Sequence, residues 1–433
     1  MKHVAVFFLL LCGFFVCSAW GQQRAHIPRL GKSGILPNRQ AHVIPRSTPT
    51  TANQSAAVAK TKFYDLGKYP SGTWAETMDI NDWDVAVGLG DTPAGYDASL
   101  DPPRGYTRPI GIPLFGPGAM HWFDLGTFGG ESNQNTFETA NTAASGITNT
   151  GMIVGLAPRA DNYIRAFAWT AKSGLVELGA LEDLGYHYSN ALGVNRLGTI
   201  ITGWSGAIDN FTLPALPVFW TPFVVQHHGK PVITWNIHQL EISGYEQFPY
   251  WVAETANDFR QITGFAFDDS GNELGFLWNR ISGGGWKILQ MPVPRKYADY
   301  VLSYAGGINE KGEIVGNIWN ADYSLGFPVL WQPTDPYRQH YKMTVLGAPP
   351  GIPDNSSFPA SINDLGDIVG TSYDADGSPM PAYWSTKSPS SAQLLDFNGY
   401  FGVANKVNNL RMVVGGYWSD TCPQGCAAAV QLH

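Results

Sequence analysis

Hydrophobic and polar residues follow one another along this chain in short segments, and one pattern recurs. Residues 308–316 read "INEKGEIVG": an apolar residue, Asn, a polar pair, Gly, and then apolar residues that end in a second Gly. The Asn side chain can open a turn by bonding to the backbone two residues on, and the first Gly suits the left-handed conformation that closes a bulged hairpin. The pattern predicts the end of one β-strand, a tight turn and the start of the next strand.

This hairpin pattern occurs seven times, with its final glycines 45 to 67 residues apart, a spacing typical of propeller blades. The copies are "INDWDVAVG" (80–88), "ITNTGMIVG" (147–155), "VNRLGTIITG" (194–203), "ANDFRQITG" (256–264), "INEKGEIVG" (308–316), "INDLGDIVG" (362–370) and "VNNLRMVVG" (407–415). At the left-handed position, Asp84, Arg260 and Arg411 replace Gly in three copies. We expect modest strain at the two arginines.

Two more apolar segments follow each of the first six hairpins, so that each of these repeats holds four short strands. The first set of segments is "AMHW" (119–122), "AFAW" (166–169), "PVFW" (217–220), "GFLW" (275–278), "PVLW" (328–331) and "PAYW" (381–384). The second set is "FDLG" (123–126), "VELG" (176–179), "NIHQL" (236–240), "WKILQ" (286–290), "TVLG" (344–347) and "QLLDF" (393–397). Repeats of four apolar, aromatic-rich strands predict blades that bury both faces against their neighbours.

The last repeat has only three strands before the chain ends, and "FYDLG" (63–67) matches the missing fourth. The prediction is an all-β, seven-bladed β-propeller of four-stranded blades, closed by residues 63–67 pairing with the C-terminal three strands, which removes exposed sheet edges. The expected blades are residues 68–126, 127–179, 180–242, 243–291, 292–347, 348–397 and 398–433 plus 63–67. The insertion at 90–118 is expected to cover the central channel or to decorate the rim.

The first 62 residues differ in character from the rest. Residues 1–21 contain Lys2, the apolar run "VAVFFLLLCGFFV" and small residues at Ala19 and Gly21, which predicts a signal peptide cleaved before Gln22 and hence a secreted protein, extracellular or periplasmic. Residues 22–62 hold seven Lys or Arg and no acidic residue, and are rich in Pro, Ser, Thr and Ala. We interpret them as a flexible basic linker, with contact to an anionic surface as the alternative.

The body of the chain is acidic. Setting aside Lys2 and the seven basic linker residues leaves 19 of the 27 Lys and Arg residues against all 35 Asp and Glu residues, a net charge of −16 from residue 63 onward. This excess argues against nucleic acid and other polyanions as partners. No later run of about 20 apolar residues predicts a membrane span. We expect a monomer.

Four cysteines are present, and two of them, Cys12 and Cys17, lie in the predicted signal peptide. Cys422 and Cys426 flank a Pro-Gln-Gly turn in "TCPQGC", and no nearby His completes a set of soft metal ligands. The spacing predicts a Cys422–Cys426 disulfide in an oxidising compartment.

Aromatic and acidic residues follow the last Gly of several hairpin copies. Aromatic rings stack on sugar C–H faces while carboxylates accept hydroxyl hydrogens, so such pairs on one loop face suit a neutral glycan. The candidate ligand-binding residues are Trp204, Asp209, Phe267, Asp268, Trp319, Asp322, Tyr373, Asp374, Trp418 and Asp420. The alternative is structural: aromatics at a repeated position pack between blades, and Asp commonly opens a turn.

Evidence for catalysis in the sequence is slight. No HExxH, GxSxG or Walker motif occurs. His187 and Tyr188 form one adjacent acid/base pair in an inter-blade loop, with loop surface as the alternative reading. We expect no metal or other cofactor, although "DADG" (374–377) and "DDSGNE" (268–273) resemble parts of calcium loops without the full ligand schedule.

The combination of "IN..G.IVG", "AF.W" and "DLG" segments over residues 63–433 resembles the bacterial extracellular HAF-repeat family. "DLGTFGG" (124–130) and "RAFAW" (165–169) are the closest matches, with Arg165 at the family's His position. The resemblance implies export and a propeller-like array, and it brings no established reaction. Three functions stay open: a secreted module that binds a neutral glycan or a protein, a glycoside hydrolase or polysaccharide lyase, and a structural surface protein.

Overall fold

The computed structural model describes residues 58–59, 61–70, 72–91, 107–116, 118–130, 142–161, 163–206, 215–268, 270–281 and 284–433. Strands make up nearly all of the regular structure in these ranges, where the helices are two three-residue 3-10 turns, η1 (Glu182–Leu184) and η2 (Arg295–Tyr297). The predicted all-β class is confirmed. The predicted signal peptide, linker residues 22–57 and Asp209 lie outside the described residues.

The strands form antiparallel sets of four consecutive segments. The first two sets are β3 (Ala75–Ile80), β4 (Val85–Asp91), β5 (Thr107–Pro113) and β6 (Phe123–Asp124), then β7 (Ala143–Ile147), β8 (Ile153–Pro158), β9 (Ile164–Thr170) and β10 (Gly174–Glu177). The next two are β11 (Tyr188–Val194), β12 (Ile201–Gly206), β13 (Ala215–His227) and β14 (Lys230–Gln239), then β15 (Tyr250–Ala256), β16 (Gln261–Phe267), β17 (Glu273–Arg280) and β18 (Trp286–Gln290). One parallel bridge, Ala215 to Tyr250, joins these two into an eight-stranded sheet.

The C-terminal half continues the arrangement. β19 (Leu302–Ile308), β20 (Ile314–Trp319), β21 (Gly326–Pro333) and β22 (Tyr341–Val345) form one sheet. β23 (Ser357–Ile362), β24 (Asp367–Tyr373), β25 (Pro379–Ser385) and β26 (Gln393–Leu395) form the next, to which β1 (Val58–Ala59) adds in parallel. In the last sheet, β27 (Phe401–Val407), β28 (Met412–Ser419) and β29 (Cys422–Leu432) are joined by β2 (Thr61–Gly67), so the expected pairing of the N-terminal strand with the C-terminal three is present.

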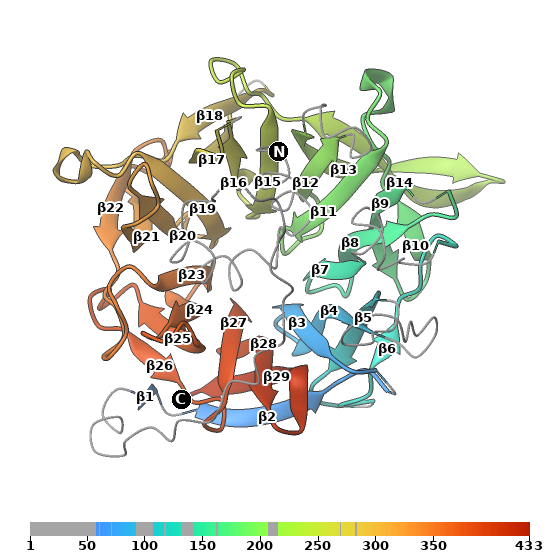
Figure 1. The fold of residues 1–433 in the computed structure, drawn as a ribbon. Helices are drawn as coiled ribbons and strands as arrows, with labels where there is room; N and C mark the ends of the chain where they lie inside the picture. The colour runs from blue at the N-terminus through green and yellow to red at the C-terminus, as the bar shows by residue number, and fades with distance from the viewer. Residues whose placement is uncertain are drawn as a thin grey trace, which may run out of the picture.

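The sheets follow one another around a common centre (Figure 1). The first strand of each set contacts the first strand of the next, through β3, β7, β11, β15, β19, β23 and β27, and β27 contacts β3. Between the sheets lie fully buried aromatic side chains from the recurring apolar segments, among them Trp220, Trp278, Trp331 and Trp384. The core is therefore divided into layers between sheets.

The repeated Asn both closes its own hairpin and ties its sheet to the next. In one copy, Asn309 Oδ1 accepts the backbone N–H groups of Lys311 (3.1 Å) and Glu313 (2.9 Å), and Asn309 Nδ2 donates to Asn363 O (3.0 Å) in the following copy. Asn408 Nδ2 in the last copy donates to Asn81 O in the first, at 2.9 Å. The predicted left-handed position is confirmed in every copy, at Asp84, Gly151, Gly198, Arg260, Gly312, Gly366 and Arg411.

One strand assignment was wrong. "AMHW" (119–122) was expected to supply the third strand of the first set, but that strand is β5, which lies inside the segment interpreted as an insertion. Residues 118–120 form a turn with Met120 in the left-handed region, and Trp122 Nε1 donates to Leu66 O at 3.2 Å. Trp122 thus contacts β2 in the neighbouring sheet.

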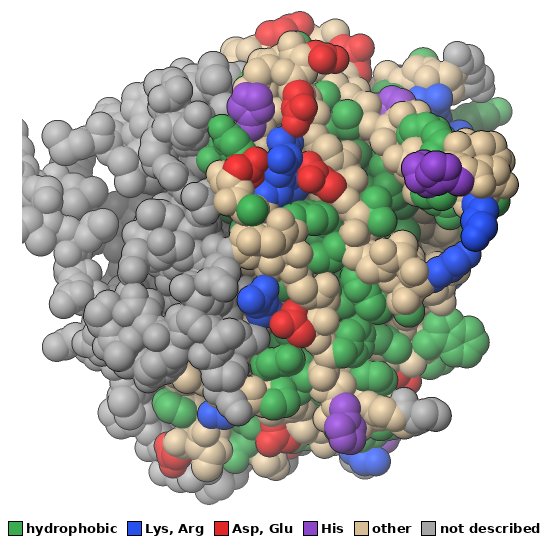
Figure 2. Space-filling view, turned by 90° about the vertical axis from the view of Figure 1, so that its right-hand side faces the viewer, with side chains coloured by type: hydrophobic (Ala, Val, Ile, Leu, Met, Phe, Trp, Pro, Cys, Tyr) green, Lys and Arg blue, Asp and Glu red, His purple; other side chains and the backbone are tan. Residues whose placement is uncertain are grey.

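The hairpin of β13 and β14 extends past its neighbours as a two-stranded ribbon (Figure 1). Its outer part exposes Val224 and Ile233, which lie opposite each other, and ends in a turn at His228 and Gly229. Figure 2 views this side of the molecule and shows hydrophobic and His side chains at the surface. His227 and His228 are both exposed at this end of the ribbon.

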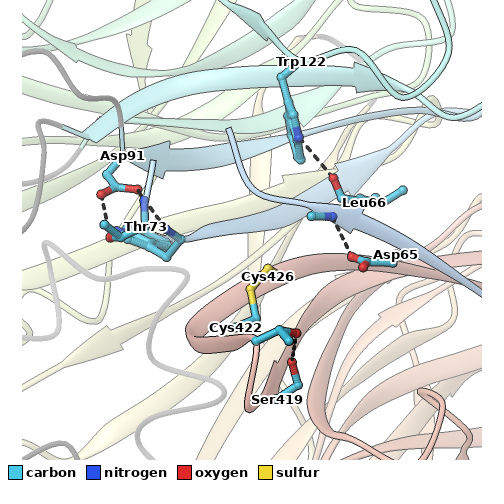
Figure 3. The surroundings of a disulfide bond; sticks show 11 residues. Asp65, Leu66, Thr73, Asp91, Trp122, Ser419, Cys422 and Cys426 are labelled. Atoms are coloured by element: carbon cyan, nitrogen blue, oxygen red, sulfur yellow. Dashed lines mark hydrogen bonds between the residues drawn. A yellow bond between two sulfur atoms is a disulfide. The ribbon is translucent and has the colours of Figure 1, made fainter. Parts of the chain in front are cut away.

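The predicted disulfide joins Cys422 and Cys426 at the start of β29 (Figure 3). Both cysteines are buried and belong to a core cluster that includes Val413 and Val430. The bond closes a local loop beside the β28–β29 turn.

Candidate functional site: a cavity between the first strands

A cavity lies where the first strands of the sheets converge, and every one of those strands contributes to its wall. Each of these strands has a β-bulge at the same place. The bulged residue lies two positions before the apolar residue that begins the hairpin pattern. The bulged residues are Met78, Ser145, Leu192, Glu254, Gly306, Ala360 and Asn405, and all of them line the cavity. Because a bulge redirects a side chain and is common next to functional sites, this ring of bulges defines the candidate site.

An ion pair lies in the wall of the cavity. Lys406 Nζ is 3.5 Å from Asp79 Oδ1. The same carboxylate accepts backbone N–H groups of Ile80 on Oδ1 and of Ile147 on Oδ2, each at 2.9 Å. Burial raises the pKa of Asp79, while Lys406 and the two N–H donors act in the opposite direction. Asp79 is therefore held in place, and Lys406 keeps ammonium hydrogens available toward the cavity.

Glu254 is a second buried carboxyl group in the cavity wall. Its residue is 9% exposed, and Oε2 makes no hydrogen bond to any residue that the structure describes. Burial and then the nearby Glu273 raise the pKa of Glu254 to about 8, against the opposing effect of Lys406. A carboxyl group in this state is protonated at neutral pH and can donate a hydrogen bond to a ligand.

A third carboxyl group, that of Glu76, lies next to the bulge of the last sheet. Asn405 Nδ2 donates to Glu76 Oε1 at 2.7 Å and to Thr77 O at 2.9 Å. Burial raises the pKa of Glu76, and the Asn405 bond partly opposes this shift. Glu76 and Asn405 thus couple the first and last sheets at the cavity wall.

Small residues provide the space. Gly193, Gly306, Gly307 and Ala360 occupy wall positions from β11, β19 and β23, and Ser145 Oγ is buried with no hydrogen bond among the described residues. The cavity volume is about 80 Å³. Since one water needs about 10–15 Å³ by the same measure, the cavity holds several waters or one small polar group of a larger ligand.

Four of the five aromatic residues proposed for glycan stacking are buried: Trp204, Phe267, Trp319 and Tyr373. Their strands are covered on both faces by neighbouring sheets, so their rings pack in the core and do not form an exposed stacking surface. Trp204 and Phe267 belong to the same cluster as the cavity-lining Met78 and Leu192. Trp418 is half-buried.

The acidic partners of those aromatics hold turns. Asp268 Oδ1 accepts the N–H groups of Ser270 and Asn272, and Asp374 Oδ1 accepts those of Asp376 and Ser378. Asp322 Oδ1 likewise accepts the N–H and hydroxyl of Ser324, and Asp420 is exposed in the turn before β29. The structure therefore gives the first three residues the structural role that was the alternative interpretation.

The pair His187 and Tyr188 does not act as one unit. Tyr188 is buried in the cluster of Trp204, whereas His187 is exposed. Both rings contact Tyr163, with centroid distances of 5.4 Å for His187 and 5.1 Å for Tyr188. In the described ranges, no group of three or more His, Cys, Asp or Glu side chains is arranged to hold a metal ion.

The comparisons with known proteins are weak. No protein-family model and no curated protein matches the chain. A sialidase of Trypanosoma rangeli in complex with 2,3-difluorosialic acid has 10% identity over 87% of this chain and 59% of its own, with a TM-score of 0.41. An Arg-to-Ala mutant of AofleA from Arthrobotrys oligospora has 11% identity over 78% of this chain and 90% of its own, with a TM-score of 0.39. An acylaminoacyl peptidase of Pyrococcus horikoshii has 10% identity over 82% of this chain and 50% of its own, with a TM-score of 0.44. These similarities carry no conclusion about function.

Proposed function

We propose that the described sheets are the seven four-stranded blades of a β-propeller of the HAF-repeat type, closed by β2. The continuous series of contacts from β3 through β27 and back to β3 supports the ring, as does the Asn408–Asn81 hydrogen bond between the last and first hairpins. We also propose that the protein is exported, a proposal that the Cys422–Cys426 disulfide supports because such bonds persist in oxidising compartments. None of the helices in the described ranges has the length and hydropathy of a membrane span.

We propose that the protein binds a neutral, hydroxyl-rich ligand, a sugar unit of a glycan, with one hydroxyl-bearing group in the cavity. The observation that carries this proposal is the buried Glu254 carboxyl group, whose pKa burial raises to about 8, in the same cavity wall as the Asp79–Lys406 ion pair. A neutral carboxyl group and a compensated ion pair leave the cavity with little net charge, so a charged ligand gains little there. Hydroxyl groups both donate and accept, which matches Glu254, Ser145 and Lys406.

A screen of the purified protein on an array of neutral and acidic glycans tests this proposal, followed by calorimetry with a bound neutral glycan. Lys406→Met should weaken that binding at least about tenfold, because a charged donor to a ligand is worth roughly 1.5–3 kcal/mol. Ala360→Leu should abolish binding by filling the cavity. Lys342→Met, on the outer strand β22, is the matched control and should bind as the unmodified protein does. A preference for acidic glycans, or equal binding by the Lys406 and Lys342 variants, would refute the proposal.

A glycoside hydrolase is the second candidate, and the pKa of Glu254 is the specific observation for it. A carboxyl group with a pKa of about 8 is a suitable proton donor to a leaving oxygen, and Asp79 supplies a second carboxyl group in the same cavity. Release of reducing sugar from a bound glycan, lost in Glu254→Gln while binding persists, would establish this function. Glycan binding without release of any reducing sugar would leave a binding module as the function.

A further inference from the structure

The hairpin turns at the other end of the first strands carry a ring of exposed apolar side chains. These occupy the position two residues after the repeated Asn in five of the seven turns: Trp83 (72% exposed), Leu197 (63%), Phe259 (62%), Leu365 (50%) and Leu410 (53%). Thr150 and Lys311 take this place in the remaining two. We call these five residues the apolar ring. Exposed apolar residues gathered at one place mark an interaction surface.

Inside the apolar ring, the residue directly after the repeated Asn, or after Thr148 in the second copy, forms a polar hub. Its members are Asp82, Asn149, Arg196, Asp258, Glu310, Asp364 and Asn409. The side chains connect neighbouring turns: Glu310 N donates to Asp364 Oδ1 (2.8 Å), Asp364 N to Asn409 Oδ1 (2.9 Å), and Asn409 N to Asp82 Oδ1 (2.8 Å). The turns therefore meet around one point.

The hub is an acidic centre with one basic side chain. Arg196 reaches both Asp258 Oδ2 and Asp364 Oδ2, each at 3.4 Å, although these residues lie in different turns. Together with Asp82 and Glu310 this makes four carboxyl groups to one guanidinium. Burial is the main cause of the raised pKa of Glu310, and the charges of Asp258 and Asp364 add to it. An apolar ring around an acidic hub fits a partner in which basic residues lie among apolar ones.

The chain itself approaches this surface from outside the described residues. β1 runs parallel to β26, with Val58 opposite Leu394 and Ala59 opposite Leu395. β26 follows the turn at 386–392, which touches the hairpin turn of its sheet because Thr386 N donates to Gly366 O at 2.9 Å. The chain that precedes Val58 therefore enters the sheet from the end of the molecule that carries the hub.

The length and charge of that preceding segment match the surface. From β1 the hub lies about four strand spacings away, roughly 19 Å, and the twelve residues 46–57 can span about 40 Å when extended. Residues 22–57 contain five basic residues (Arg24, Arg29, Lys32, Arg39 and Arg46), no acidic residue, and interspersed Ile, Leu and Val. A second copy of the same surface would instead bring two acidic hubs together, which is unfavourable.

We propose that the basic segment 22–57 docks on the end of its own chain formed by the apolar ring and the acidic hub, with a basic side chain at the hub and apolar side chains against the ring. The segment would then cover the exposed apolar side chains. Opposite charges at this surface make the docking weaker as ionic strength rises.

Zero-length carbodiimide coupling of the purified full chain tests the contact. Lys32 is the only lysine in residues 22–57. In the monomeric fraction, mass spectrometry should find Lys32 joined to peptides that contain Asp82, Asp258, Glu310 or Asp364, and these products should decrease at 0.5 M salt. Lys32→Arg keeps the charge but removes the amine, so it should abolish the products. Lys32 joined elsewhere, or only between two molecules, would overturn the proposal.

Trypsin cleavage of the segment gives a second measure. The double variant Trp83→Ser/Leu365→Ser should be cut at Arg39 and Arg46 at least about fivefold faster than the unmodified chain, because cleavage follows the undocked population. The matched control, Leu184→Ser/Val301→Ser, removes two apolar side chains that are also more than half exposed but lie outside the ring, and it should leave the rate unchanged. Equal rates in both variants would contradict docking. So would segment cleavage that slows only when phosphatidylserine vesicles are added, because the segment would then bind a membrane and not this surface.

Discussion

The titration of Glu254 gives a pH dependence of stability whose sign and size follow from its surroundings. Burial and Glu273 raise the pKa of Glu254 in the folded protein from 4.5 to about 8. Between those two pH values the folded chain binds a proton at this group that the unfolded chain does not bind. The free energy of unfolding therefore falls by about 1.4 kcal/mol per pH unit across this window.

The whole contribution, over 3.5 pKa units, is about 5 kcal/mol. Stability from this group is fully present below pH 4.5 and is lost by pH 8. Glu254→Gln keeps the shape but cannot ionise. The variant should match the unmodified protein at pH 4.5 and exceed its free energy of unfolding by several kcal/mol at pH 8.5.

Urea unfolding followed by tryptophan fluorescence at pH 4.5, 6, 7 and 8.5 measures this difference. Asp354→Asn, at an exposed turn position, is the control and should follow the unmodified protein at each pH. A constant difference between Glu254→Gln and the unmodified protein over the four pH values would refute the reasoning, because it would show that Glu254 ionises normally in the folded state.

Three further predictions concern the scaffold. Asn408→Ala removes the hydrogen bonds with Met412 N and Asn81 O and should lower the free energy of unfolding by about 2–4 kcal/mol. The control Asn320→Ala, in an exposed turn, should lower it by under about 1 kcal/mol in the same urea assay. Arg260→Gly relieves a left-handed residue and should stabilise by about 0.5–1 kcal/mol in thermal unfolding; a lower melting temperature would contradict this. Cys422→Ser opens a short loop and should cost about 2 kcal/mol, and treatment of the unmodified protein with reductant should reproduce that loss.

The scaffold was predictable because each hairpin repeats the same local physics. The Asn side-chain oxygen accepts two backbone N–H groups, and together with a residue in the left-handed region this fixes the turn. The strands on either side of the turn then need only apolar side chains to pack against neighbouring sheets. The third strand of the first set escaped prediction because β5, "TRPIGIP", contains no aromatic residue and lies in a Pro- and Gly-rich segment. The Trp122 segment carried the expected pattern but belongs to a turn that packs on the next sheet.

The candidate site was not predictable from the aromatic pattern. A strand that lies between two neighbouring sheets is buried on both faces, so its sequence does not alternate between apolar and polar residues. The sequence around Trp204, Phe267, Trp319 and Tyr373 therefore does not show whether each aromatic side chain packs in the core or faces the loops. By sequence, the acidic residues that follow these aromatics suit sugar binding and turn closure equally well. In the structure, Asp268 and Asp374 close turns. Chemistry alone could not separate the two.

A usable signal for the cavity was nevertheless present in what differs between copies. The two positions that precede the first apolar residue of each hairpin copy read Met-Asp, Ser-Gly, Leu-Gly, Glu-Thr, Gly-Gly, Ala-Ser and Asn-Lys in successive copies. They vary in size and charge although the turn that follows barely changes. A β-bulge at each first position turns these residues toward the cavity, so three sheets supply Asp79, Glu254 and Lys406, while the other four supply mainly small residues that leave space, with Leu192 as the exception. A repeated scaffold can therefore acquire a specific site by variation at two positions per repeat, without disturbing the hydrogen bonds that close its turns.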